Sequence, residues 1–326
     1  MTTRTAIRRR GLVNAISLLL LVTAGVACAR PRPRLDPVPA PSTSVRVQLS
    51  EGTRILSIEL EDYIVGSILA EADVRGLDSV EADRVAQVQA ILARTYAVFN
   101  RGRHAHEGFD LCATTHCQVY RPVDTMSDQA ASLAASAASA TTGLVISYDG
   151  QPINAVYHAD CGGSTSAATV AWGGADPPYL RGVRDPFCRR NDPQPWRFEI
   201  DLTALLNALR TDPRTRVGTD LHDILIAEQD RSGRVVRAVI KGNEGTAEVR
   251  GEDLRRLLSQ HFGPLSIKST RFTVQRLADR FIFEGWGFGH GVGLCQRGAV
   301  ERARSGHTPQ TIIAHYYPGT ALRQYY

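Results

Sequence analysis

The sequence predicts an α+β fold, in which helices and β-hairpins form one main body and a smaller α/β subdomain is inserted at about residues 196–270. Hydrophobic residues alternate with polar ones in several short stretches separated by Gly-containing turns, which indicates β-hairpins. Two longer stretches show the helical repeat instead. The chain has 326 residues, of which 43% are hydrophobic, and this is enough to build a large core.

The elements expected in the first half alternate between hairpins and helices. A stretch rich in Ala and Ser, residues 128–140, has helix propensity but little to bury. The sequence Asp149-Gly150 is typical of a tight hairpin turn. The other expected elements, in order, are a hairpin of residues 45–49 and 55–58, helices at 62–72 and 80–99, and a hairpin of 144–148 and 152–157.

The second half begins with a proline-rich stretch, residues 177–195, that is predicted to be a long loop. The expected subdomain follows it. Its predicted elements are a strand around 198–200, a helix at 203–210, paired strands at 235–240 and 247–249, and a helix at 252–258. A last hairpin of residues 271–274 and 281–284 leads into a glycine-rich run.

The first 29 residues predict an export signal, because a basic start precedes an apolar core and small residues. Cleavage after Ala29 would release the protein, whereas cleavage before Cys28 would leave a lipid-anchored cysteine. Residues 30–44 form a Pro/Arg-rich linker. We therefore expect the protein in the periplasm or at the extracytoplasmic face of the membrane, with no other membrane contact.

The charge distribution argues against a nucleic-acid partner. The formal net charge is +5, but seven arginines lie within the first 34 residues. The part expected to fold is therefore close to neutral, and it lacks the basic surface that nucleic acids require.

A glycine-rich run near the end of the chain places Gly287, Gly289, Gly291 and Gly293 at alternating positions around His290. Such a run loses backbone entropy on folding unless the chain must bend tightly or approach something closely. The histidine could then present its ring to a ligand. The alternative is a glycine-rich turn that leads into a helix.

Glu71 is the first candidate for catalysis. Leu60, Ile64, Ile68 and Glu71 follow the spacing of one helical face, so the glutamate ends an apolar stripe. A carboxyl group in such a place pairs with a cation or has a raised pKa, which suits a general acid. The alternative is a glutamate of the last helical turn that faces solvent.

A second candidate site combines two histidines and two cysteines within a dozen residues. His106, Cys112, His116 and Cys117 are ligand types that tetrahedral Zn²⁺ prefers, and His104 is a further, less favoured candidate. Because export favours disulfides, a bridge between Cys112 and Cys117 is an equal alternative.

A third group begins at the end of a predicted strand, where His158 precedes a Gly-Gly turn. Trp172 follows it, and an aromatic ring beside open backbone could stack on a sugar. Cys161 and Cys188 flank this loop and could be bridged. Cys295 would then remain as a free thiol or a metal ligand.

Several segments, in the same order, resemble the stage II sporulation protein D family, which includes amidase-enhancer proteins. The resemblance covers the chain from about residue 45 to its end. It rests on Glu61–Glu71, Gln87–Ala97, Thr114–Tyr120, Tyr157–Gly163, Trp172-Gly173, Gly289–Ala299 and His315–Gly319. This sequence has Cys295 where the family usually has Ser, and Arg297 where it often has Tyr.

The resemblance implies a lytic transglycosylase that acts on the glycan strands of peptidoglycan, with Glu71 as its catalytic residue. It also implies one structural Zn²⁺ at His106, Cys112, His116 and Cys117. We expect the substrate-binding residues to be His158, His290, Gln296 and Gln118.

A single carboxyl group suffices for this chemistry, because the C6 hydroxyl of the substrate itself can close a 1,6-anhydro ring. Two other functions remain open. The chain could be a non-catalytic wall-binding protein that stimulates an amidase, as the enhancer branch of the family implies. It could also be a hydrolase that pairs Glu71 with Asp160 or Asp110.

Overall fold

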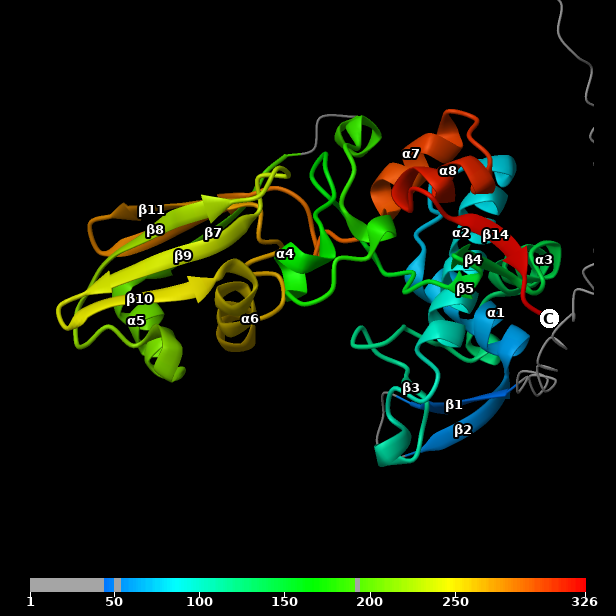
Figure 1. Cartoon of the computed structure of the whole chain (residues 1–326), viewed down its shortest axis with the longest axis horizontal. Coiled ribbons are helices and arrows are strands. Elements are labelled where there is room, and N and C mark those ends of the chain that lie inside the picture. The colour runs from blue at the N-terminus through cyan, green and yellow to red at the C-terminus, as the bar shows by residue number, and fades with distance from the viewer. Residues whose placement is uncertain (1–43, 50–53, 191–193) are drawn as a thin grey trace, which may run out of the picture. The chain divides into compact units, whose positions relative to one another are not determined.

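The computed structural model describes residues 44–49, 54–190 and 194–326 (Figure 1). The expected export signal with Cys28, and residues 30–43 of the expected linker, lie outside the described residues. Within the described ranges, no helix has the length and apolar character needed to cross a membrane. The elements form a mixed α+β fold, which confirms the fold class that the sequence predicts.

The main body is built around α2 (Ser79–Phe99). A capping box at Asp78 and Glu81 starts this helix by satisfying backbone N–H groups of its first turn. Its side chains from residue 88 to 97 are buried on every face. A helix buried on all sides needs neighbours all round it. The neighbouring helices are α1 (Leu60–Glu71), α3 (Asp128–Ala140), α7 (Gln296–Arg304) and α8 (Pro309–Tyr316).

The Ala-rich helix α3 has more to bury than the sequence suggested. Ala134, Ala137 and Ala138 are part of a core that also includes residues of α1 and α2. Side chains this small allow helix axes to approach closely. The low apolar content of α3 therefore reflects close packing against its neighbours.

Short strands surround the helices of the main body. In one sheet β1 (Ser44–Gln48) pairs antiparallel with β2 (Ile55–Glu59) and parallel with β3 (Leu111–Cys112). In another, β4 (Leu144–Tyr148) lies between β5 (Gln151–Pro152) and the C-terminal strand β14 (Ala321–Gln324). The first hairpin is thus confirmed, and the second is shorter than predicted.

The predicted strand at 152–157 is divided in two. After β5 the chain leaves β4, and β6 (Tyr157–His158) pairs in parallel with β13 (Leu294–Cys295). The Val156 carbonyl accepts hydrogen bonds from the Leu294 N–H at 3.2 Å and the Tyr317 hydroxyl at 2.6 Å. Backbone groups must find partners when buried, and here the partners come from the C-terminal third of the chain.

A separate core holds the predicted subdomain. Its elements are β7 (Trp196–Asp201), α5 (Leu202–Arg210), β8 (Leu221–Gln229), β9 (Val235–Gly242), β10 (Gly245–Arg250), α6 (Gly251–Phe262), β11 (Phe272–Leu277) and β12 (Arg280–Gly285). The strands form two sheets with the orders β10-β9-β8 and β11-β12-β7. The sequence analysis did not anticipate β8.

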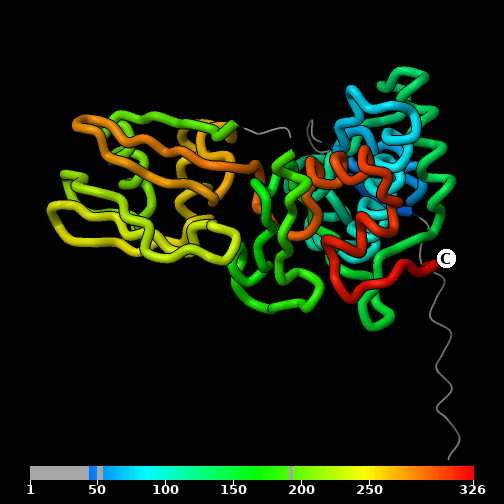
Figure 2. Tube along the Cα trace, turned by 90° about the horizontal axis from the view of Figure 1, so that it is seen from above, coloured from blue at the N-terminus to red at the C-terminus, as the bar shows by residue number. Residues whose placement is uncertain are grey.

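This core extends beyond the expected limit at residue 270. Strand β12 pairs with β7 along its whole length, and the β11–β12 hairpin lies alongside β7 in Figure 2. Phe272 and Phe283 stack edge to face at 5.5 Å inside the same core as Trp196. The last hairpin therefore completes the subdomain before the chain returns to the main body.

The predicted loop at 177–195 contains only short helical turns where it is described, at Pro178–Leu180 and Pro186–Arg189. The short helix α4 (Ala168–Trp172) precedes it. Further single turns lie at Ala105–Glu107, Val123–Thr125 and Pro213–Thr215.

One buried ion pair joins several of these elements. Arg94 of α2 donates two hydrogen bonds to Glu61 of α1, at 2.7 and 2.6 Å. Its remaining N–H groups reach the carbonyls of Ala138 at the end of α3 and Leu144 of β4. The Arg94 side chain is fully buried, so its charge depends on Glu61 for compensation.

We expect Glu61→Gln to lower the free energy of unfolding by about 3 kcal/mol, because it leaves a buried guanidinium without a counter-charge. Chemical denaturation would measure this. Glu248→Gln is the control, since its ion pair with Arg237 is exposed and screened by solvent, so its loss should change stability little. Equal losses in the two variants would contradict the structural role of the buried pair.

Candidate functional site

Glu71 is the last residue of α1, and its carboxyl group is held by two donors. The Val119 N–H donates to Oε1 at 2.5 Å, and the Tyr157 hydroxyl donates to the same carboxyl group. Burial raises the pKa of Glu71, while these two hydrogen bonds oppose the rise because they favour the ionised form. The carboxyl group that the sequence placed at the end of an apolar stripe is therefore poorly solvated.

The segment that supplies Val119 reaches α1 because of Gly66. A Cβ atom on Gly66 would lie 2.3 Å from the ring of Tyr120, so no other residue fits without displacing that ring. The Gly66 carbonyl accepts a hydrogen bond from the Arg121 N–H at 3.0 Å, and Tyr120 stacks on Tyr63 at 5.5 Å. The segment is thus fixed against the helix that carries Glu71.

Two glutamines complete the surroundings of Glu71. Gln118 is buried, accepts from the Tyr63 hydroxyl at 3.0 Å and donates to the Tyr157 hydroxyl at 3.1 Å. Gln296, at the start of α7, donates to the backbone carbonyl of Glu71 at 3.0 Å. Both glutamines were expected to bind substrate, and the structure brings both to Glu71 or to its partner Tyr157.

Tyr157 was not predicted as a site residue. The neighbouring His158 was, but adjacent side chains of a strand point to opposite faces. Because Tyr157 faces Glu71, His158 faces the other way and is buried. The alternation itself was the available signal, although it does not say which residue faces the acid.

His158 and His290 lie together, with ring centroids 5.4 Å apart. His290 accepts from the Val292 N–H at Nδ1 and donates from Nε2 to the Tyr157 carbonyl at 3.0 Å. Burial and the nearby Arg234 lower the pKa of His290 to about 4, so the ring is neutral. Both of its nitrogens are engaged by backbone, and only the ring face remains for a ligand.

His158 donates from Nδ1 to the Val292 carbonyl at 3.1 Å, and burial lowers its pKa well below the usual range. Its Nε2 has no hydrogen-bond partner among the described residues. The ring of Trp172 lies 5.0 Å from that of His290, and its side chain is one of the exposed large hydrophobic groups.

The glycine run approaches another part of the chain, as its composition suggested. A Cβ atom on Gly291 would lie 2.2 Å from the buried guanidinium of Arg234. One on Gly293 would lie 2.0 Å from the Val156 carbonyl oxygen, and both glycines have positive φ. The run therefore packs against the strand that carries Tyr157 and His158.

The candidate metal ligands form one cluster, in which His104 takes the place expected for His106. His104, Cys112, His116 and Cys117 have ligand atoms within 4.8 Å of one another, and His104 Nε2 lies 3.3 Å from the Cys117 sulfur. His106 is not in this group, which corrects the expected ligand set. It lies in the Ala105–Glu107 turn with its side chain 78% exposed, and it faces Glu107.

These four residues are a donor set that could hold a tetrahedral metal ion. Cys117 directly precedes Gln118 and Val119, so the cluster lies next to the segment that holds Glu71. The described cysteines, including Cys112 and Cys117, are free thiols, and neither expected disulfide is present among the described residues.

The two carboxyl groups considered as partners of Glu71 are engaged elsewhere. Asp110 accepts from the backbone and side chain of Arg46, at 2.8 and 3.2 Å. Asp160 is partly buried and accepts from the Cys188 thiol at 3.0 Å. Burial and the Cys188 sulfur raise the pKa of Asp160 to about 6.

Comparison with known proteins shows which family this chain resembles. A family model described as "Stage II sporulation protein" matches residues 49–148, and one described as "Domain of unknown function (DUF8618)" matches residues 188–293. The chain is 30% identical over 270 residues to an uncharacterized protein of Brachyspira hyodysenteriae, covering 82% of this chain and 67% of that protein. The chain belongs to the stage II sporulation protein D family.

Two further relatives are named proteins of Bacillus subtilis. Stage II sporulation protein D of Bacillus subtilis is 26% identical over 294 residues, covering 86% of this chain and 79% of the relative. The amidase enhancer of Bacillus subtilis is 28% identical over 286 residues, covering 73% of this chain and 38% of the relative.

The raised pKa of Glu71 predicts a gain in stability when its charge is removed. Below the ordinary pKa of 4.5 the carboxyl group is protonated in both the folded and the unfolded chain. As the pH rises through the raised pKa of the folded state, ionisation in the poorly solvated site costs stability. We expect Glu71→Gln to melt at a higher temperature than the parent at neutral pH, with the difference vanishing in acid.

Glu59→Gln is the matched control, because Glu59 directly precedes the same helix and is exposed. Scanning calorimetry as a function of pH would measure both variants. A lower melting temperature of Glu71→Gln at neutral pH would show that the carboxylate is well solvated or firmly paired, contrary to the structure.

Proposed function

We propose that this chain is an exported protein that acts on the bacterial cell wall, cleaving peptidoglycan glycan strands as a lytic transglycosylase. One observation carries the proposal: the carboxyl group of Glu71 has its pKa raised by burial and is held by Val119 and Tyr157. Membership of the stage II sporulation protein D family and the match to an amidase enhancer support a role at the cell wall.

In the first step Glu71 donates its proton to the glycosidic oxygen between MurNAc and GlcNAc, and the bond from that oxygen to the MurNAc C1 breaks. The resulting carboxylate then takes the proton of the MurNAc C6 hydroxyl as its oxygen attacks C1. This closes a 1,6-anhydro ring and returns the proton to Glu71. No water is consumed, so the products are an anhydro end and a free GlcNAc hydroxyl.

The surroundings of Glu71 suit both steps. Burial favours the protonated form needed at the start, whereas the donors Val119 and Tyr157 stabilise the carboxylate formed in between. Because these effects on the pKa of Glu71 oppose each other, one group can act first as an acid and then as a base. Gln118 and Gln296 position this apparatus through Tyr157 and the Glu71 backbone.

For substrate contact we propose Trp172, whose exposed ring lies against that of His290. Aromatic faces stack on the apolar faces of sugar rings. His290 contributes its ring face here, and His158 supports it from the buried side. A two-carboxylate hydrolase receives less support, because Asp110 is paired with Arg46, and Asp160 accepts from the Gly162 N–H and pairs with Arg297.

The donor set of His104, Cys112, His116 and Cys117 fits a structural Zn²⁺, with two thiolates and two imidazoles. Bound there, the ion would tie the turn at His104 to the segment before Gln118. Its contribution to function is to fix the backbone that presents the Val119 N–H to Glu71.

A second candidate function is stimulation of a cell-wall amidase without catalysis. The match to a protein named amidase enhancer favours it, although this chain covers only 38% of that protein. Both functions would place the protein on peptidoglycan, outside the cytoplasmic membrane.

We expect Glu71→Gln to reduce release of 1,6-anhydro-MurNAc ends from purified glycan strands by at least about 100-fold, since it lacks the transferable proton. Mass spectrometry of the products measures this, with Glu59→Gln as an active control. Parent activity should fall as the pH rises through the raised pKa of Glu71. Tyr157→Phe should move that fall to higher pH, because it removes a donor to the carboxylate.

Anhydro ends produced by Glu71→Gln at the parent rate would refute the catalytic role. Reducing ends in place of anhydro ends would indicate hydrolysis. If the parent releases neither but accelerates a purified amidase, the chain is an enhancer.

The cluster of His104, Cys112, His116 and Cys117 is called the first cluster here. His104→Ala should abolish its zinc binding, whereas His106→Ala should retain it. The two variants form a matched pair, because both histidines flank the same turn but only His104 joins the cysteines. Metal analysis after dialysis against a chelator measures the difference. The structure would be contradicted if His106→Ala lost this zinc ion and His104→Ala kept it.

A further inference from the structure

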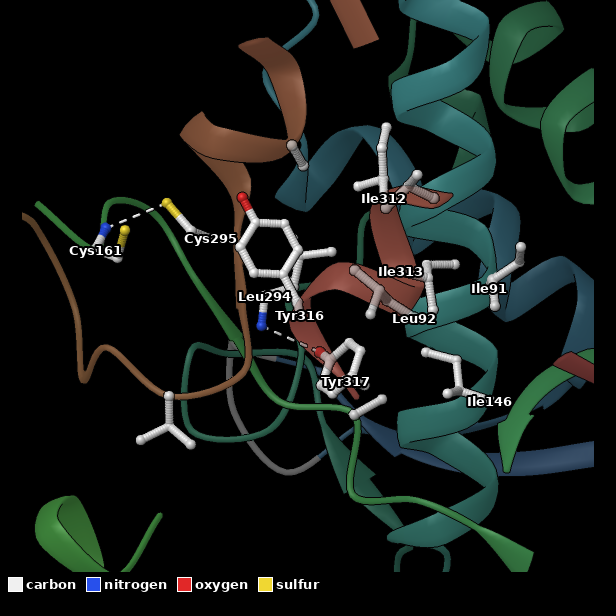
Figure 3. Packing of buried hydrophobic residues seen from close by; sticks show 14 of the residues in the cluster. Ile91, Leu92, Ile146, Cys161, Leu294, Cys295, Ile312, Ile313, Tyr316 and Tyr317 are labelled. Carbon is white, nitrogen blue, oxygen red and sulfur yellow. Dashed lines mark hydrogen bonds between the residues drawn. The ribbon is translucent and has the colours of Figure 1, made fainter. Parts of the chain in front are cut away.

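Three cysteines and an aspartate from distant segments meet in a second cluster. Cys161 follows β6, Asp185 and Cys188 lie at the Pro186–Arg189 turn, and Cys295 directly precedes α7. Each of the four residues is 0% exposed. Their ligand atoms lie within 4.8 Å of one another, and Figure 3 shows Cys161 and Cys295 facing each other.

The sulfur atoms accept hydrogen bonds from backbone N–H groups. The Cys161 N–H points to the Cys295 sulfur at 3.2 Å, and the Gly298 N–H reaches the same sulfur at 3.4 Å. The Gly163 N–H points to the Cys161 sulfur at 3.3 Å. The backbone therefore holds the sulfur atoms of Cys161 and Cys295 in place as hydrogen-bond acceptors.

The carboxylate of the second cluster has partners of its own. Arg302 lies 3.4 Å from Asp185, and the Tyr316 hydroxyl donates to Asp185 at 2.6 Å. These groups orient the carboxylate and offset part of its charge, as the partners of a metal-ligating carboxylate do.

The spacing fits one tetrahedral ion. Zinc–sulfur bonds are about 2.3 Å long, so two sulfurs on one tetrahedral zinc lie about 3.8 Å apart. The Cys188 and Cys295 sulfurs are 3.5 Å apart, and the Cys161 sulfur lies 3.6 Å from the Asp185 carboxylate. A disulfide would require the two sulfurs to approach to about 2.05 Å and would leave the third cysteine unpaired in the core.

The backbone around the cluster is shaped to allow this approach. A Cβ atom on Gly298 would lie 2.0 Å from the Asp185 carboxylate and 2.2 Å from the Tyr316 hydroxyl. The first turn of α7 can therefore approach Asp185 only because residue 298 has no side chain.

We propose that Cys161, Asp185, Cys188 and Cys295 bind a second structural metal ion of the Zn²⁺ class. Three thiolates with one carboxylate are a donor set that zinc accepts. The ion joins the end of β6, the proline-rich loop and the start of α7. It thereby fixes Tyr157 and Gln296, each of which contacts Glu71, relative to each other.

The test measures zinc in the exported full chain and in Cys112→Ser/Cys117→Ser, which lacks the thiolates of the first cluster. After dialysis against a chelator, we expect about two zinc ions per parent chain and one per variant chain. X-ray absorption of the variant should show three sulfur neighbours at about 2.3 Å and one oxygen at about 2.0 Å. All three remaining core thiols should react with an alkylating agent after denaturation with chelator and no reductant.

A Cys188–Cys295 disulfide found by peptide mapping would overturn the proposal, and so would three free thiols without metal in a folded variant. If the double variant does not fold, the parent decides. Two ions in the parent that share five sulfur neighbours support the proposal. A single ion in the parent that Cys295→Ser still binds overturns it. Cleavage of glycan strands is not part of this test, so its result is independent of the proposed activity.

Discussion

The arrangement of the site depends on the parallel pairing of β6 with β13. This pairing brings the Val156–His158 segment against residues from the C-terminal third, where Val156 satisfies both Leu294 and Tyr317. From it follow the contact of Tyr157 with Glu71, the burial of His158, and the position of Gln296 on the Glu71 carbonyl. Parallel strands need a long connection, and here that connection includes the whole subdomain, so residues far apart in the sequence share one site.

Opposing effects set the pKa of Glu71. Burial raises the pKa of Glu71, and its position at the C-terminal end of α1 adds the negative end of a helix dipole, which also disfavours the carboxylate. Val119 and Tyr157 act in the opposite direction by donating hydrogen bonds. Both donors come from outside α1, so the balance depends on how two other segments are held against this helix.

The sequence alone predicted the residues whose local pattern determines their environment. Glu71 ends an apolar stripe, the long helix 80–99 is found at Ser79–Phe99, and the glycine run does make close contacts. It could not choose between His104 and His106, because residues two apart on a 3₁₀ turn point about 120° apart and the turn itself was not predicted. Tyr157 and the extent of the subdomain depended on long-range strand pairing, which hydrophobic periodicity does not encode.

The two cysteine-containing clusters are close in sequence to the segments that supply the partners of Glu71. Cys117 directly precedes Gln118 and Val119, whereas Cys295 directly precedes Gln296, and Cys161 lies shortly after Tyr157. Each of these partners of Glu71 thus lies within four residues of a cysteine. Irregular segments such as these have few ladder hydrogen bonds to fix them, and a metal–thiolate centre can supply that rigidity. With the two proposed ions bound, the position of the Glu71 carboxyl group would depend on metal cross-links in the loops, while the helices supply the framework.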